Sequence, residues 1–100
     1  MLHPLVKYNN EQVAIQLAQL NQHTVKKWKI VENQLYKKFT FSSFDEAVAF
    51  IIQTTALAKS ANHHPIICNA YKQVEITLFT FSIKGLSHKD FDMSTQLEQL

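Results

Sequence analysis

The helix-to-strand transition that decides this fold reads Lys59-Ser60-Ala61-Asn62-His63-His64-Pro65. Proline has no backbone N–H to donate and disfavours helical geometry in the residue before it, so the preceding helix must end before His64. Imidazole is the side chain best suited to carry protons near neutral pH. The stretch therefore predicts two proton carriers on a loop beside a helix end. Two solvated loop histidines with no chemical role are the alternative interpretation.

Upstream of this transition, the clearest helix begins at Ser43. The sequence Ser43-Phe44-Asp45-Glu46 has the form of a capping box, in which the serine hydroxyl accepts from the backbone N–H of Glu46 and Glu46 reaches back. The apolar face expected for this helix consists of Phe44, Ala47, Val48, Ile51, Ile52 and Thr55.

Two further helices flank this central region. Apolar residues at helical spacing predict a helix over residues 10–20, with Asn9 or Asn10 as its cap. A final helix is expected from Ser87, with Asp90 as the capping carboxylate three residues on. The apolar side of that last helix consists of Phe91, Ser94, Leu97 and Leu100.

Four segments alternate with a period of two and predict strands over residues 28–32, 35–41, 66–71 and 74–82. Tight turns are expected at Asn33-Gln34 and Lys72-Gln73. The resulting order, α-β-β-α-β-β-α, indicates an α+β fold. We expect a four-stranded antiparallel sheet with three helices on one face.

The last predicted strand has two different faces. One face consists of Val74, Ile76, Leu78 and Thr80, and the other of Glu75, Thr77, Phe79 and Phe81. Helices on one side of the sheet cannot cover both faces, so we expect the face with the two phenylalanines to meet a ligand or a second subunit. Burial of both faces in the core is the alternative.

Composition favours one compact domain over residues 1–100. Of these 100 residues, 46% are hydrophobic and only one is glycine, and no stretch has the composition of a linker. No apolar run is long enough to span a membrane or to resemble a secretory signal, so a cytoplasmic protein is expected. The single cysteine, Cys68, is expected to be a small apolar filler in a reducing compartment.

The net charge is only +2, but lysines gather around the first predicted hairpin, at positions 26, 27, 29, 37 and 38. They indicate either an anion-binding patch or solvated lysines that protect a strand edge from aggregation. All ten basic residues are lysines, and arginine, the usual bidentate partner of guanine and phosphate, is absent. Binding to nucleic acid is therefore disfavoured.

Over nearly its whole length the chain resembles the pterin-4a-carbinolamine dehydratase family, also known as the dimerisation cofactor of a homeodomain transcription factor. The matching residues are spread from the first predicted strand to the last helix: Trp28, Phe39-Thr40-Phe41, Phe44, Ala47, Phe50, His63-His64-Pro65, Tyr71, Val74-Glu75-Ile76-Thr77-Leu78, Thr80, Gly85-Leu86-Ser87 and Asp90. Such a series of spacings is far more specific than the histidine pair alone.

The resemblance implies a hydro-lyase, a 4a-hydroxytetrahydropterin dehydratase that removes water from the product left by an aromatic amino acid hydroxylase in tetrahydropterin recycling. It implies general acid and base catalysis without a metal or an organic cofactor. By this resemblance the catalytic residues are His63, His64 and Asp90. The substrate-binding residues are Asn62, Pro65, Tyr71, Phe79, Thr80 and Phe81. A homodimer or homotetramer is also implied, with a hydroxylase as a candidate protein partner.

Two positions depart from the family pattern. The family has a third histidine, or sometimes tryptophan, where this chain has Phe81, which can stack on a flat pterin but cannot transfer a proton. Animal members carry glutamate four residues before the first histidine, where this chain has Lys59. His88 is a candidate substitute for the missing imidazole, or else an exposed residue of the first helical turn. Phe81 predicts a slowed or altered dehydratase, whereas the charge reversal at Lys59 occurs in some other members.

Two other classes of function remain open. The first is a binding or assembly module that keeps the fold and a pterin-shaped cleft without efficient chemistry, which both departures favour. The second is a metal site built from His63, His64, Cys68 and His88. It is disfavoured because adjacent histidines rarely bind one ion together and no ligand pair has the spacing of a zinc finger.

Overall fold

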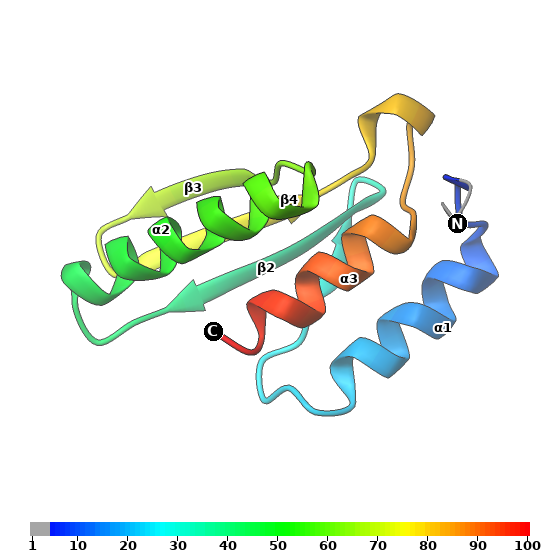
Figure 1. Ribbon diagram of the computed structural model, residues 1–100. Coiled ribbons are helices and arrows are strands. Elements are labelled where there is room, and N and C mark those ends of the chain that lie inside the picture. The colour runs from blue at the N-terminus through cyan, green and yellow to red at the C-terminus, as the bar shows by residue number, and fades with distance from the viewer. Residues whose placement is uncertain (1–4) are drawn as a thin grey trace.

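The computed structural model describes residues 5–100 and shows three α-helices packed on one face of a four-stranded antiparallel sheet (Figure 1). The elements follow in the order α1 (Asn10–Asn21), β1 (Lys29–Val31), β2 (Gln34–Thr40), α2 (Phe44–Ala61), β3 (Ile66–Ala70), β4 (Gln73–Leu78), the short 3₁₀ helix η1 (Phe81–Ile83) and α3 (His88–Leu97). The α+β class and the element order predicted from the sequence are confirmed.

The strands lie in the order β1-β2-β4-β3, so the two hairpins join through β2 and β4 in the middle of the sheet. Between these central strands, Leu35 lies opposite Leu78 and Thr40 opposite Gln73. α2 packs on β4, and α3 lies between α2 and α1 in contact with both (Figure 1). This arrangement places α3 where it can meet the loops that follow α2 and β4.

Both hairpin turns lie one residue earlier than predicted. The first turn is Glu32-Asn33, and both residues have positive φ, 51° and 63°, as in the two-residue turns that match the twist of a hairpin. The second turn is Tyr71-Lys72, with Tyr71 at φ 53°. Gln34 and Gln73 therefore begin strands instead of forming turns.

β4 ends four residues earlier than predicted because the chain turns back on itself. Thr80 forms an isolated antiparallel bridge with Gly85, and η1 lies between them. The exposed fraction of Phe81 is 60%, whereas Phe79 is half-buried against the core. The prediction that one face of the sheet carries both phenylalanines is therefore wrong, because Phe81 lies in η1 and not in the sheet.

The helices begin at the caps that the sequence predicts. The Asn9 side chain and Gln12 form a capping box at the start of α1, with both hydrogen bonds at 2.8 Å. Ser43 caps α2 by accepting from the N–H of Glu46 at 3.1 Å. The Glu46 carboxylate reaches back to the N–H of Ser42 (3.0 Å) and not to that of the cap itself.

The buried face of α2 is rotated away from the predicted one. Its buried residues are Ala47, Phe50, Thr54 and Ala58. Phe44 and Ile52, which the prediction placed on this face, are 46% and 62% exposed. Residues 47–52 are apolar at every position, so spacing alone does not determine which side meets the sheet. Leu100, expected on the buried side of the last helix, follows α3 and is exposed.

The core lies between the sheet and the helices. Its buried residues are Trp28, Leu35, Ala47, Phe50, Ala58, Val74, Ile76, Leu78, Leu86, Phe91, Met93 and Leu97. Cys68 is exposed, so its predicted role as an apolar filler is wrong. Within residues 5–100, no helix has both the length and the apolar character needed to cross a membrane.

One lysine of the predicted patch belongs to the interior. Lys37 on β2 is 6% exposed, and its Nζ lies 2.6 Å from Oε2 of Glu98, just beyond α3. The same carboxylate oxygen accepts from Nε1 of Trp28 at 2.9 Å. A buried ammonium group requires such a partner because desolvation of an unpaired charge is costly. The pair therefore ties the end of α3 to the sheet.

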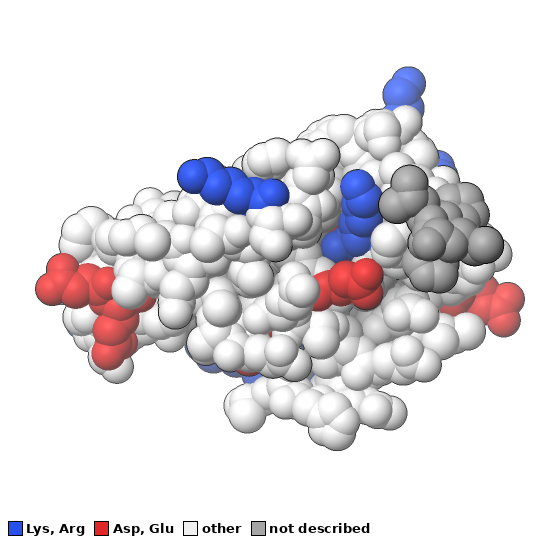
Figure 2. Space-filling model, viewed as in Figure 1, with Lys and Arg blue, Asp and Glu red and all other residues white. Residues whose placement is uncertain are grey.

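The surface that the described residues form in Figure 2 carries no comparable cluster of lysines. Its lysines are scattered, and acidic side chains gather over the start of α2.

We expect Glu98→Gln to lower the free energy of unfolding by ~2 kcal/mol, because it leaves the Lys37 ammonium buried without a counter-charge. Urea unfolding monitored by circular dichroism measures this change. The double variant Lys37→Met/Glu98→Gln should recover most of the loss, since methionine keeps the apolar stem and removes the charge. If the double variant is no more stable than Glu98→Gln, Glu98 stabilises the fold by some means other than its ion pair with Lys37.

Candidate active site

A buried carboxylate, that of Asp90 in the first turn of α3, connects three separate segments of the chain. Asp90 is 0% exposed, and its Oδ1 lies 2.7 Å from Nε2 of His63. Its Oδ2 accepts from the hydroxyl of Thr80 at 2.7 Å and from the backbone N–H of Ser87 at 3.0 Å. The capping carboxylate expected from the sequence is thus also the partner of the first histidine.

The hydrogen-bond chain around Asp90 has a single consistent direction. The Thr80 hydroxyl gives its proton to the carboxylate, so its oxygen accepts from the Ser87 hydroxyl at 2.8 Å. The Ser87 oxygen in turn accepts from the N–H of Lys89 at 3.2 Å. Because a carboxylate only accepts, His63 carries its proton on Nε2 toward Asp90. In the neutral ring, the lone pair is then on Nδ1.

The end of α2 explains why the two histidines have different surroundings. Asn62 adopts left-handed geometry (φ 49°), and the N–H of His63 bonds back to the carbonyl of Ala58 at 3.1 Å. This closing turn directs His63 toward α3, where it is 8% exposed. Both histidines lie on a loop, as the sequence predicts, but only His64, which precedes Pro65, is exposed.

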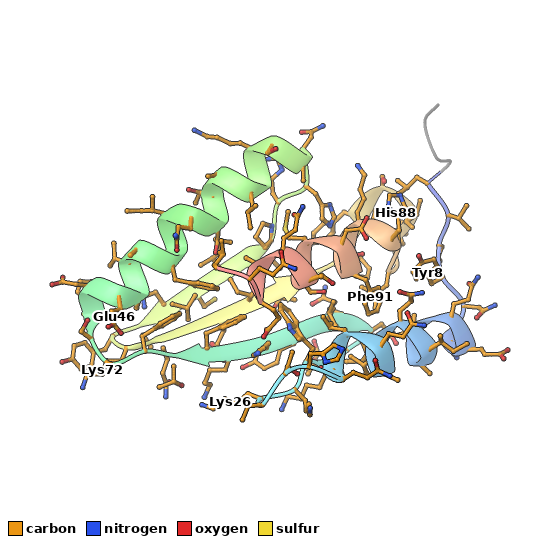
Figure 3. The ribbon with its side chains drawn as sticks, turned by 60° about the horizontal axis from the view of Figure 1, so that its bottom comes forward. Tyr8, Lys26, Glu46, Lys72, His88 and Phe91 are labelled. Carbon is orange, nitrogen blue, oxygen red and sulfur yellow. The ribbon has the colours of Figure 1, made fainter. Side chains whose placement is uncertain are left out.

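A hollow of about 230 Å³ reaches His63 between the end of α2 and the start of α3. The first residue of α3, His88, lines the same hollow and is labelled in Figure 3. Nδ1 of His88 lies 3.2 Å from Oδ2 of Asp92, one turn further along the helix. Two imidazoles, one from the loop after α2 and one from α3, therefore border one concavity. The sequence offered His88 only as a substitute, and the structure places it beside His63.

Three predicted substrate contacts lie in or next to this cluster. Asn62 ends α2, and the half-buried Pro65 leads directly into β3. Thr80 is buried, with its hydroxyl committed to Asp90 and Ser87. As a result, Thr80 positions the carboxylate and has no remaining hydroxyl proton for a ligand.

The aromatic residues predicted to contact substrate lie elsewhere. Phe79 and Phe81 pack edge to face with ring centroids 5.0 Å apart, and neither lines the hollow beside His63. Tyr71 lies in the β3–β4 turn, at the opposite end of β3 from the histidines, and stacks on Phe44 at 6.4 Å. A single chain therefore does not bring Tyr71 to the histidines.

The residues of the metal-site hypothesis are not assembled. Among residues 5–100, no group of three histidine, cysteine or acidic side chains could hold a metal ion. Cys68 lies exposed on β3, outside the hollow that His63 and His88 share.

Reasoning from the sequence missed the part played by Ser87. Its hydroxyl was expected only to cap α3, yet it also holds Thr80 in place. No local pattern in the sequence signals this contact, because it depends on the turn that bridges Thr80 to Gly85 and brings Thr80 beside Ser87.

The family model described as pterin 4 alpha carbinolamine dehydratase matches residues 6–100 of this chain. The chain belongs to the pterin-4a-carbinolamine dehydratase family. A relative from Roseiflexus sp., provisionally named as such a dehydratase, is 37% identical over 73 residues, which cover 73% of this chain and 78% of the relative. The resemblance inferred from the sequence is thereby confirmed.

Solved structures of dehydratase-like proteins share the fold. A transcriptional coactivator/pterin dehydratase from Brucella melitensis superposes with a TM-score of 0.85 at 26% identity, covering 94% of this chain and 97% of that one. A pterin dehydratase-like protein identified as a RuBisCO assembly factor in the alpha-carboxysome superposes with a TM-score of 0.62 at 22% identity. The second match covers 77% of this chain and 89% of that one, and it concerns the fold alone.

We expect Asp90→Asn to destabilise this dehydratase-family fold by ~3 kcal/mol, because one amide oxygen cannot accept from three buried donors. The His63 proton should also redistribute between Nε2 and Nδ1, which ¹⁵N NMR of the imidazole distinguishes. Asp92→Asn, on the exposed side of the same helix, is the matched control and should leave both readouts unchanged. A wild-type His63 protonated on Nδ1 alone would contradict the assigned hydrogen-bond direction.

Proposed function

We propose that this protein is a 4a-hydroxytetrahydropterin dehydratase, a hydro-lyase that acts in tetrahydropterin recycling. In this reaction the bond between carbon 4a and the hydroxyl oxygen breaks, and the hydroxyl leaves as water after taking up a proton. A ring nitrogen loses its proton, and a carbon–nitrogen double bond forms. One group must donate a proton and another must accept one, which side chains alone can do.

The observation that carries this proposal is the buried Asp90–His63 contact at 2.7 Å. The carboxylate fixes both the ring orientation and the tautomer of His63, so its Nδ1 is the atom left to exchange a proton with substrate. Other catalytic imidazoles have the same arrangement, in which a buried carboxylate orients the ring and does not itself react. We therefore assign Asp90 as a positioning residue and His63 as the catalytic residue.

His64 supplies the second imidazole in this proposal. It does not line the hollow, but it is exposed and adjacent in the chain to His63, so we assign it the opposite proton transfer on the part of the pterin that lies outside the hollow. His88, which shares the hollow with His63, is the third candidate proton carrier. The hollow is smaller than the roughly 300–1,000 Å³ of typical ligand sites, so we propose that the pterin occupies it only in part.

We expect His63→Ala to lower the turnover of freshly generated 4a-hydroxytetrahydropterin by about 10²-fold or more, measured above the spontaneous rate. His64→Ala and His88→Ala should show which imidazole serves the second transfer. His23→Ala, an exposed histidine beyond α1, is the control and should retain full turnover. Wild-type turnover equal to that in buffer would eliminate the enzymatic proposal.

We expect Phe81→His to raise turnover, by up to about 10²-fold, because it restores an imidazole where other family members have one. Phe81 is 60% exposed, so the substitution should leave the free energy of unfolding nearly unchanged. Phe81→Leu is the matched control, since it removes the ring without adding a proton carrier. Equal turnover of wild type and Phe81→His would place residue 81 off the reaction path.

We further propose that the protein acts in the cytoplasm as a homodimer or homotetramer and works alongside an aromatic amino acid hydroxylase. Support for assembly comes from apolar side chains that one chain leaves exposed, including Phe44, Ile52 and Ile66. Support for a reducing compartment comes from Cys68, which is a free thiol.

The second candidate function is a binding or assembly module. Its support is that Phe81 cannot carry a proton and that the RuBisCO assembly factor named above has the same fold. In that case a stable protein partner should be captured equally by the wild type and by His63→Ala, while neither protein accelerates dehydration. Capture that depends on His63 would argue against this candidate.

A further inference from the structure

A second hollow, of about 360 Å³, is lined in part by the loop after β4 and shares no lining residue with the hollow beside His63. It is built from the segment before α1, α1 itself, the β1–β2 turn and the loop after β4. Its lining is Lys7, Tyr8, Asn10, Val13, Ile30, Glu32, Asn33, Phe79, Lys84, Gly85 and Leu86. The size and the mixture of side chains are those of a small-molecule site.

The floor of this hollow is apolar and aromatic. Val13, Ile30 and Phe79 are half-buried there and pack against the core, and Leu86 is 4% exposed. Tyr8 lies beside Phe91, with ring centroids 6.1 Å apart (Figure 3). Burial and the neighbouring Asp92 raise the pKa of Tyr8, so its phenol stays neutral at physiological pH and does not repel an anion. An aromatic ring placed on this floor would remove apolar surface from water.

The rim of the hollow carries the charges. Lys7 and Lys84 contribute two ammonium groups, and Glu32 contributes one carboxylate. Among the described residues, neither lysine has an acidic side chain within 4.0 Å. The rim therefore has an excess of one positive charge and two unpaired donors, which favours an anion over a cation.

The backbone holds one of these lysines over the hollow. The N–H of Tyr8 donates to the carbonyl of Leu86 at 2.8 Å, which fixes the segment before α1 against the loop. The stem of Lys7 then lies directly on Gly85, where an added Cβ would come within 2.6 Å of Lys7 Cε. The absence of a side chain at position 85 thus leaves room for the Lys7 stem to lie against the loop. Lys84 is positioned by its left-handed backbone (φ 52°) at the end of η1.

We propose that this hollow binds a small aromatic monocarboxylate, with the ring on the apolar floor and the carboxylate between the ammonium groups of Lys7 and Lys84. The proposal does not depend on the dehydratase reaction, because the site shares no residue with His63, Asp90 or His88. Two of its lining residues precede partners of Asp90 in the chain: Phe79 precedes Thr80, and Leu86 precedes Ser87.

Titration of ¹⁵N-labelled protein with 3-phenylpropionate tests this site directly. We expect the backbone amide signals of Ile30, Asn33, Phe79 and Gly85 to shift together and to saturate. The neutral analogue 3-phenylpropan-1-ol should bind more weakly, because it keeps the ring and loses the charge. Equal affinity for the two compounds, or shifts confined to other parts of the chain, would overturn the proposal.

Variants of the rim identify the groups that hold the carboxylate. Lys7→Gln and Lys84→Gln should each weaken binding of 3-phenylpropionate by about two- to fivefold, as expected for exposed ion pairs. Glu32→Gln should strengthen binding, because it removes a like charge from the rim. Lys72→Gln, in the β3–β4 turn, is the matched control and should have no effect. Equal losses in Lys72→Gln and Lys84→Gln would show that binding follows net charge and not this hollow.

Discussion

The structure depends on one constraint above others, the need to supply a fully buried carboxylate with hydrogen-bond donors. Asp90 has no contact with water, so its charge is tolerable only because three donors surround it. These donors come from the end of α2, the loop after β4 and the cap of α3. Asp90 therefore fixes these three segments relative to one another, and it fixes the orientation of His63 as well.

The same carboxylate serves the local structure and the site. As part of a capping box it begins α3 through the N–H of Ser87, a role that involves only neighbouring residues. Its second oxygen is directed at His63, which is 27 residues away in sequence. The residue that caps the helix thus also orients the imidazole that we propose as the proton carrier. The left-handed Asn62 completes the arrangement by turning the chain sharply at the end of α2.

A second buried charge pair performs a purely structural task at the other end of α3. Lys37 and Glu98 lie 2.6 Å apart, and the indole of Trp28 satisfies the same carboxylate. α3 is therefore fixed at its beginning by Asp90 and at its end by Glu98. These two anchors fix the helix that carries His88 into the hollow that His63 also lines.

The sequence by itself determined the class of fold, the two hairpins, the helix caps and the position of the histidine pair, but not the pairing of β2 with β4 that joins the hairpins. These features follow from local rules: period-two alternation, capping residues and the effect of Pro65 on the residue before it. The family resemblance was likewise visible in residues spread along the chain, from Trp28 to Asp90. The contact between Asp90 and His63, although both residues were named as catalytic, was not determined by any of these rules.

Tertiary structure alone decided which residues meet. The buried face of α2 could not be read from a stretch that is apolar at every position, and the exit of Phe81 from the sheet depends on a bridge between Thr80 and Gly85. The separation of Tyr71 from the histidines follows from the direction of β3 in the sheet. The physical reason is the same in each case. Local propensity fixes elements, whereas contacts between elements depend on how distant surfaces pack and on which buried polar groups find donors.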